Sequence, residues 1–300
     1  MPKGKVFKAL SGFYYVRWEG GLTECRARGK FRRDGVSPMV GDDVMFELSG
    51  QSGAVTEILP RKNCFIRPAV ANVDYLVILC ANVNPVTDPF LVDRVAVIAE
   101  HVGCGVIICI NKCDLDRGDQ LYEAFSVNTG YPVIRTSAVT GEGCEALISL
   151  IKGKTVAFTG NSGVGKSSLL NALEPALGLA TGDVSDRLGR GRHTTRHIEL
   201  FDVGGTLIAD TPGFSSFDLT QMQKMRKDEL QLAFPEFRPL LGHCRFDDCA
   251  HLREPGCAVL EALRCGQIAP TRHESYQRLY EVLAAQQDWE MKDTQTEKRV

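Results

Sequence analysis

The sequence predicts a multidomain chain: a small β-barrel, a central α/β domain and a small, mainly helical C-terminal domain. Two changes of pattern along the 300 residues support this division. Short runs rich in β-branched and aromatic residues give way near residue 72 to alternating strand and helix patterns. After residue 217, helical patterns over 221–237 and 272–292 flank a turn-rich segment that carries cysteines. We therefore expect domains over residues 1–67, 72–217 and 218–300.

The N-terminal segment contains five strand-like runs and no helical pattern: KVFKAL, FYYVRWE, LTECRARGKFRR, DDVMFEL and GAVTEILP. Five short strands with glycine turns between them favour an OB-fold barrel. Residues 1–67 hold twelve Lys and Arg against seven Asp and Glu, with aromatic residues among them (Phe13, Tyr14, Tyr15, Trp18 and Phe31). Such a barrel can hold a nucleic-acid backbone and stack bases. The alternative is a solvated basic face on an ordinary β-core.

The central segment alternates strand and helix patterns, which predicts a mainly parallel sheet covered on both faces. Within it, GNSGVGKSS follows the strand TVAFT and opens the helix KSSLLNAL, the context that the phosphate-binding pattern G-x-x-x-x-G-K-S requires. Its backbone N–H groups would surround phosphate oxygens at a helix N-terminus. We expect Lys166 to contact the β- and γ-phosphates and Ser167 to ligate Mg²⁺. The predicted loop consists of Gly160, Asn161, Ser162, Gly163, Val164, Gly165, Lys166, Ser167 and Ser168.

Two further motifs predict that the base is guanine. NKCD, from Asn111 through Lys112 and Cys113 to Asp114, follows the strand GVIICI. The Asp114 carboxylate can accept hydrogen bonds from guanine N1–H and the exocyclic amine, a pair that adenine does not offer. Asn111 would meet N7 and brace the phosphate loop, and the Lys112 stem would lie over the base. TSA, with Ser137 and Ala138, follows the next strand, and the Ala138 N–H would meet guanine O6.

DTPGF supplies the remaining nucleotide element, directly after the strand GTLIA. Asp210 would hold Mg²⁺ through water, and the Gly213 N–H would contact the γ-phosphate. The candidate switch, GDVSDRLGRGRHTTRHIEL, precedes it. Thr194 or Thr195 would ligate Mg²⁺ when the γ-phosphate orders this segment. Its arginines could contact RNA phosphates instead (Arg187, Arg190, Arg192 and Arg196).

The order of these motifs predicts a circularly permuted P-loop GTPase. An ordinary small GTPase runs from the phosphate loop through DxxG to NKxD and SA, whereas this chain places NKCD and TSA first. Permutation is tolerated where chain termini lie close together. As a consequence, the segments that sense the nucleotide lead directly into the C-terminal domain.

The residue after DTPG is Phe214, where Ras-like GTPases have a glutamine that positions the attacking water. Phenylalanine cannot hydrogen-bond water, so catalysis needs another group. His193 is the candidate, with His197 behind it, and we expect slow intrinsic turnover that a partner accelerates. The alternative is that His193 contacts only RNA or solvent.

The segment HCRFDDCAHLREPGC predicts a metal site. Cys244, Cys249, His251 and Cys257 form a Cys3His set, which suits one structural Zn²⁺ in a closed tetrahedron. His243 and Cys265 are alternative ligands for the fourth position, and chance clustering of three cysteines is the other interpretation.

The eleven cysteines, the absence of a signal-peptide pattern and the lack of any run of ~18–20 apolar residues predict a cytoplasmic protein with reduced thiols and no membrane contact. The net charge of −2 says little about partners. We also expect a monomer.

Together, NKCDL, GNSGVGKSSLLNAL, GRHTT, ADTPGFSSF and HCRFDDCAHLREPGC resemble the signatures of the bacterial ribosome small subunit-dependent GTPase A family, over nearly the whole chain. The resemblance implies a late assembly factor that binds the 30S subunit, a barrel that contacts 16S rRNA, and GTP hydrolysis to GDP stimulated by that subunit. It also implies zinc at Cys244, Cys249, His251 and Cys257. The hydrophobic side chain of Phe214 fits the family as well.

Two other functions are compatible with the motifs. The first is an RNA-binding module that holds GTP as a structural ligand, which the missing glutamine at Phe214 slightly favours. The second is a permuted GTPase that acts on the large subunit or on another RNA. Turnover on the cognate RNA separates an enzyme from a binding module.

Overall fold

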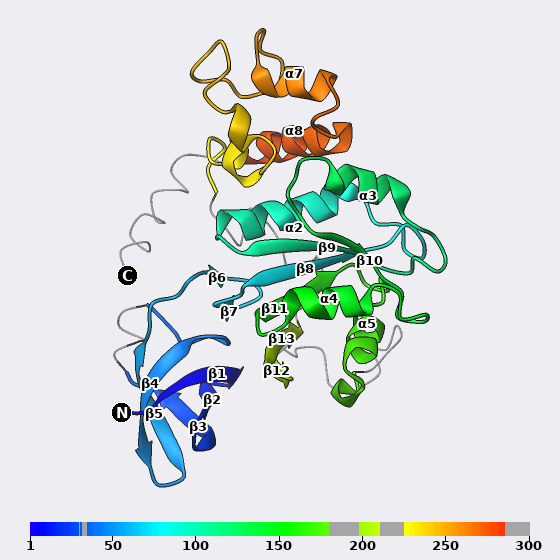
Figure 1. Ribbon diagram of the computed structural model, residues 1–300. Helices are drawn as coiled ribbons and strands as arrows, with labels where there is room; N and C mark the ends of the chain where they lie inside the picture. The colour runs from blue at the N-terminus through cyan, green and yellow to red at the C-terminus, as the bar shows by residue number, and fades with distance from the viewer. Residues whose placement is uncertain (30, 32–34, 180–197, 211–224, 286–300) are drawn as a thin grey trace.

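The computed structural model describes residues 1–29, 31, 35–179, 198–210 and 225–285. A barrel, a sheet covered by helices and a helical C-terminal module follow one another along the chain (Figure 1). The expected fold class is therefore confirmed. Among the described residues, no helix is both long and apolar enough to span a membrane.

The barrel consists of β1 (Lys3–Leu10), β2 (Phe13–Trp18), β3 (Gly21–Ala27), β4 (Asp43–Ser49) and β5 (Ser52–Ile58), closed in the order β1-β2-β3-β5-β4. Alternating apolar side chains such as Val6, Val16, Val44 and Val55 fill its interior. The strand expected over 22–33 is shorter than predicted. It ends at Ala27, because the Phe31 N–H turns back to the Arg28 carbonyl (3.1 Å) and buries the Phe31 ring.

The central sheet has six strands in the order β10-β9-β8-β11-β13-β12. Neighbouring strands are parallel except β12 and β13, which form an antiparallel edge pair. The strands are β8 (Tyr75–Cys80), β9 (Gly105–Ile110), β10 (Val133–Arg135), β11 (Thr155–Gly160), β12 (Leu200–Val203) and β13 (Thr206–Asp210). The mainly parallel sheet predicted from the strand–helix alternation is thus confirmed.

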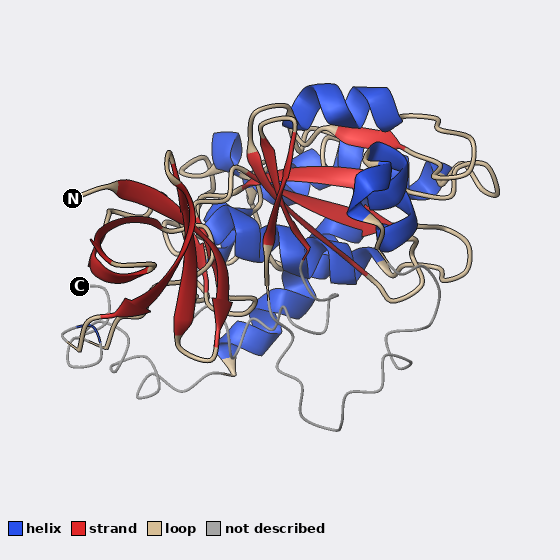
Figure 2. Ribbon diagram, turned by 90° about the horizontal axis from the view of Figure 1, so that it is seen from below, coloured by secondary structure: helices blue, strands red, loops and turns tan. Residues whose placement is uncertain are grey.

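Helices cover both faces of this sheet (Figure 2). Alternate residues of β8 divide between two apolar clusters, because successive strand side chains point to opposite faces. One cluster contains α2 (Pro89–His101) and α3 (Asp119–Ser126), and the other contains α4 (Cys144–Ile151) and α5 (Lys166–Leu173). A 3-10 turn, η1 (Pro175–Leu177), follows α5. Asp88 caps α2 by accepting the Phe90 N–H (2.9 Å), and Pro89 occupies the first turn.

The segment between the barrel and the sheet is folded. It forms a short hairpin of β6 (Cys64–Phe65) and β7 (Val70–Ala71). Phe65, Val70 and Val73 are buried in the same apolar cluster as residues of β8. The barrel is therefore packed onto the central domain through its own linker.

The C-terminal module consists of η4 (Leu230–Ala233), η5 (Arg238–Leu240), α7 (Ala258–Arg264) and α8 (Pro270–Ala284). It packs on α2 and α3 (Figure 1). The helix expected over 221–237 is wrong for the described residues 225–237, which form only a short 3-10 turn. Pro235 disfavours helical backbone at the preceding residue, and Phe234 is extended (φ −107°, ψ 100°). Helix α7 was not predicted, and α8 begins two residues before the predicted start.

Candidate nucleotide site and metal centre

The nucleotide motifs meet at one edge of the sheet. NKCD follows β9, TSA follows β10, and the phosphate loop follows β11, so all three leave the carboxyl ends of parallel strands. Asp210 is the last residue of β13, in register with Phe158 of β11. In open α/β sheets this edge is where ligands bind. The permuted order of the motifs therefore still assembles one site.

The phosphate loop requires glycine at its last turn before α5. Gly165 has φ 92°, in the region that L-residues avoid, and it is the N-cap of α5. A Cβ at this position would lie 2.6 Å from Asn111 Nδ2. Val164 is fully buried, whereas Ser162 and Gly163 are exposed. The loop is thus anchored by one apolar residue and open to solvent at its tip.

Asn111 joins the three loops of the site. Its Nδ2 donates to the Val164 carbonyl of the phosphate loop (2.9 Å), and its Oδ1 accepts from Thr136 Oγ1 (3.1 Å). The side chain is 1% exposed, so both contacts are sheltered from water. A buried amide with both ends satisfied fixes the orientation of its neighbours. The spacing between the NKCD and TSA loops and the phosphate loop therefore depends on this residue.

Lys112 also reaches the phosphate loop. It has φ 61°, and its Nζ donates to the carbonyls of Gly163 (2.8 Å) and Asn84. Its neighbour Cys113 is buried, and burial raises the pKa of that thiol, which keeps it neutral. Asp114 is exposed.

The TSA loop is held by its own serine. Ser137 is fully buried, and its Oγ accepts the N–H groups of Val139 (3.2 Å) and Thr140 (3.1 Å). These bonds fix the backbone on either side of Ala138. The structure thus brings Asn111, Lys112, Ser137 and the phosphate loop into one constellation.

Several predicted site residues lie outside the described residues. These are His193, Thr194, Thr195, Gly213, Phe214, His197 and the switch arginines. For Asp210 the structure gives the strand position only. Their roles stay predictions.

The four cysteine and histidine residues predicted as metal ligands come together. One ligand atom from each of Cys244, Cys249, His251 and Cys257 lies within 4.8 Å of the others. The Cys244 Sγ–Cys257 Sγ distance is 3.9 Å, and His251 Nδ1 lies 3.6 Å from Cys244 Sγ and 3.4 Å from Cys257 Sγ. Bond lengths of ~2.3 Å to sulfur and ~2.1 Å to nitrogen place tetrahedral ligands ~3.8 Å (S to S) and ~3.6 Å (S to N) apart. The donor set therefore fits Zn²⁺. Among the described residues, the cluster does not include the alternatives His243 and Cys265.

Surrounding groups orient the ligands. Gln231 Oε1 lies 2.8 Å from His251 Nε2, so Nε2–H donates and the Nδ1 lone pair faces the three sulfurs. The N–H groups of Ala258 and Leu260 donate to Cys244 Sγ (3.4 Å) and Cys257 Sγ (3.5 Å). Such donors stabilise thiolate charge.

Burial also sets the ionisation of this cluster in the absence of a cation. It raises the pKa of Cys249 to about 12 and lowers the pKa of His251. The Cys249 thiol is therefore protonated until a cation displaces its proton.

Sequence reasoning missed two supporting residues, Gln231 and Asn84. Gln231 is twenty residues from His251 and lies in the segment misread as a helix. Asn84 acts through its backbone carbonyl, which no side-chain pattern signals. Thr136 stands in the quoted TSA motif, and its hydroxyl-to-Asn111 contact could have been proposed from there.

Comparisons with known proteins agree with this geometry. The RsgA GTPase family model matches residues 58–220, and the RsgA N-terminal domain matches residues 3–55. A curated relative from Bacillus anthracis, named small ribosomal subunit biogenesis GTPase RsgA, is 44% identical over 287 residues, covering 94% of this chain and 97% of the relative.

Two solved structures share the whole architecture. YjeQ from Thermotoga maritima has a TM-score of 0.80 at 35% identity, covering 95% of this chain and 99% of that one. YloQ, described as a circularly permuted GTPase, has a TM-score of 0.77 at 37% identity, covering 95% of each chain. With the permuted motifs meeting at one sheet edge, these matches establish that the chain belongs to the RsgA GTPase family.

Proposed function

We propose that the protein hydrolyses GTP during late assembly of the small ribosomal subunit, and that hydrolysis times its release from the 30S particle. The observation that carries the proposal is the Asn111 side chain, which links the base-reading loops to the phosphate loop. The name of the Bacillus anthracis relative, small ribosomal subunit biogenesis GTPase RsgA, supports the small subunit as the partner.

In this proposal, the guanine is held by the loops of β9 and β10. Asp114 accepts from N1–H and the exocyclic amine, and the Ala138 N–H donates to O6. Asn111 positions the phosphate loop at a fixed distance from the base. Specificity for GTP over ATP follows, because adenine would leave the Asp114 carboxylate and the Ala138 N–H without their guanine partners.

The γ-phosphate is held at the N-terminus of α5, where Lys166 and the loop N–H groups surround it. Mg²⁺, bound by Ser167 and by Thr194 or Thr195, with Asp210 acting through water, neutralises phosphate charge. His193 is the proposed residue that orients the attacking water, since Phe214 cannot do so. Without a partner the rate is slow, and contacts on the subunit complete the site.

The metal cluster is proposed to hold one structural Zn²⁺. Four protein ligands close the coordination sphere, which leaves no position for a substrate. The ion would tie the loop of residues 244–257 to η4 through Gln231. Its role is to fix the C-terminal module, not to catalyse hydrolysis.

The barrel is proposed to contact 16S rRNA on one face. Four cations of the barrel and two of its linker are in ion pairs, so the basic composition of residues 1–67 overstates the charge available to RNA. A hollow of about 420 Å³ lies between the β1–β2 turn and β3, lined in part by Phe13, Tyr14, Arg26 and Phe31. The Arg26 guanidinium lies 4.6 Å from the centre of the Phe13 ring. Aromatic and guanidinium groups together suit an unstacked base.

The proposal is tested by GTP turnover of the protein alone, with 30S subunits and with 50S subunits, beside a Lys166→Ala control. Stimulation by 30S only, lost in the control, is the expected result. Equal stimulation by 50S would assign the protein to another particle. Absence of turnover on either would favour an RNA-binding module with GTP as a structural ligand. The monomeric state and the cytoplasmic location stay predictions.

A further inference from the structure

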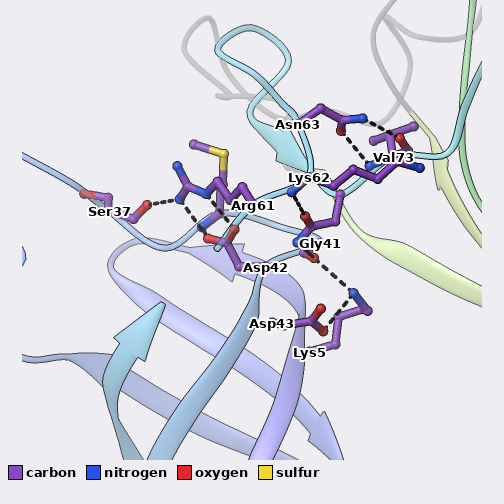
Figure 3. A network of polar contacts seen from close by, with 11 residues as sticks. Lys5, Ser37, Gly41, Asp42, Asp43, Arg61, Lys62, Asn63 and Val73 are labelled. Atoms are coloured by element: carbon purple, nitrogen blue, oxygen red, sulfur yellow. Dashed lines mark hydrogen bonds and ion pairs between the residues drawn. The ribbon is translucent and has the colours of Figure 1, made fainter. Parts of the chain in front are cut away.

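The barrel is attached to the GTPase domain at two separate places. The first is the linker, drawn in Figure 3. Arg61 forms a bidentate ion pair with the fully buried Asp42, from Nε to Oδ1 (2.7 Å) and from Nη2 to Oδ2 (2.8 Å). Its Nη2 also donates to the Ser37 carbonyl (2.9 Å). Gly41 lies so close to the linker that a Cβ there would be 2.0 Å from the Ala71 oxygen. The barrel is therefore fixed firmly to the linker.

This first attachment continues to the far end of β11. Lys62 pairs with Asp74 Oδ1 (2.7 Å), and Asp74 Oδ2 accepts the Thr155 N–H (2.8 Å). Thr155 begins β11, whereas the phosphate loop leaves the opposite end of that strand. The linker thus holds the barrel at the edge of the sheet that is remote from the nucleotide.

The second attachment joins β1 and β2 of the barrel to β12. Lys8 and Glu199 form an antiparallel backbone bridge, and Lys8 Nζ lies 2.8 Å from Glu199 Oε2. Arg17 Nη1 lies 3.2 Å from Asp202 Oδ2, and its guanidinium stacks 4.1 Å from the centre of the Phe7 ring. Phe7, Ile198 and Leu200 are buried in one apolar cluster, and β1 packs against β12, so the ion pairs lie beside an apolar region. We call these residues the β1–β12 junction.

Strand β12 lies between the two segments that are predicted to sense the nucleotide. Along the chain, β12 begins at Leu200, the last residue of the candidate switch, and it pairs with β13, which ends at Asp210. In the sheet that the described residues form, it is the antiparallel edge strand, with β13 as its neighbour. The barrel therefore touches the strand that connects the two segments predicted to sense the γ-phosphate.

We propose that the β1–β12 junction couples the barrel to the nucleotide site, with Lys8, Arg17, Glu199 and Asp202 acting as positioning residues. When the barrel binds its RNA, the position of β1 changes. The junction transmits this change to β12, and β12 transmits it to the two segments predicted to sense the γ-phosphate. The linker meanwhile keeps the barrel attached at the edge of the sheet that is remote from the nucleotide. The inference rests on the proposed function, because it assigns the route by which the subunit stimulates hydrolysis.

The test uses charge reversal in the full-length protein. Lys8→Glu and Glu199→Lys are made singly and together, and Arg17→Asp and Asp202→Arg likewise. The matched control is Arg28→Glu with Glu47→Arg, an ion pair of similar exposure that lies within the barrel. For each variant, GTP turnover is measured alone and at saturating 30S, together with the 30S concentration for half-maximal stimulation.

We expect each single reversal at the junction to lower the saturating stimulation by about fivefold, the size of a half-exposed ion pair. Lys8→Glu, Arg17→Asp and Asp202→Arg, which lie outside the candidate switch, are expected to leave intrinsic turnover unchanged. Each double reversal is expected to restore stimulation. The Arg28 and Glu47 variants are expected to keep the wild-type saturating value.

Three other results would contradict either this inference or the proposed function. Single reversals without effect at saturating 30S, while the wild type is stimulated, would overturn the inference and leave the proposed function intact. Loss that the double reversals do not restore would also overturn it, because the cations would then act on RNA directly. A wild type that 30S does not stimulate would instead reject the proposed function.

Discussion

Arg272 joins the C-terminal module to the GTPase domain through a buried ionic triad. It lies on α8 with its side chain 1% exposed. Its Nη1 donates to Asp93 on α2 (2.5 Å), and its Nε and Nη2 donate to Glu236 (2.7 and 3.0 Å). We predict that Arg272→Met lowers the free energy of unfolding by about 3–5 kcal/mol.

The magnitude follows from what the substitution leaves behind. The side chains of Asp93 and Glu236 are 0% and 1% exposed, so both carboxylates would stay in the interior without their cation. Methionine replaces much of the volume, so the main cost is the uncompensated charge rather than a cavity. Removing one partner of a buried pair costs more than replacing the whole pair by apolar groups.

The assay is urea-induced unfolding of the zinc-loaded protein, followed by circular dichroism. The control is Arg278→Met on the same helix, where the guanidinium is half-exposed and lies 3.9 Å from Asp88. That variant should lose about 1 kcal/mol or less. Adding Asp93→Asn and Glu236→Gln to Arg272→Met should recover part of the loss. A loss below about 1 kcal/mol for Arg272→Met would refute the reasoning, because the triad would then contribute no more than a surface pair.

Three other predictions follow from single contacts. Burial raises the pKa of Asp93 from 3.8 to about 6, against the opposing effect of Arg272. A raised folded-state pKa gives stability that is present below pH ~4 and lost as the pH rises through ~6. The unfolding free energy of wild type minus that of Asp93→Asn should therefore fall across this range, and a constant difference would contradict it. Gly165→Ala should weaken GTP binding at least tenfold by calorimetry, because φ 92° and the 2.6 Å approach to Asn111 Nδ2 both exclude a Cβ; unchanged affinity would contradict the loop geometry. Gln231→Ala should weaken zinc affinity by about 10- to 100-fold in a chelator competition, and unchanged affinity would show that Gln231 does not orient His251.

The sequence predicted most of the central domain, because its signals are local. Each strand of the parallel sheet is a short apolar run, and the phosphate loop, NKCD and TSA each directly follow one. The metal ligands were equally visible, since Cys244, Cys249, His251 and Cys257 lie within one segment of the chain. Local spacing was enough to predict that these groups meet.

What could not be predicted depends on contacts between distant segments. Lys8 and Glu199 are 191 positions apart, and Arg272 and Asp93 are 179 apart, so no periodicity links them. From composition alone, Lys8 and Arg17 belong to the cations that could bind RNA. In the structure, each of them is paired with a carboxylate. The segment before Pro235 has a helical composition, but one proline and the packing of Phe234 determine its backbone.

The most direct test of the central claim compares small-subunit binding in two nucleotide states. A ligand shifts an equilibrium only by its differential affinity for the two states, so a GTP-controlled timer must bind the subunit more tightly with GTP than with GDP. Co-sedimentation with 30S subunits, with GDP or a non-hydrolysable GTP analogue, measures this ratio. We predict clearly tighter binding with the analogue, and equal affinities would contradict the account.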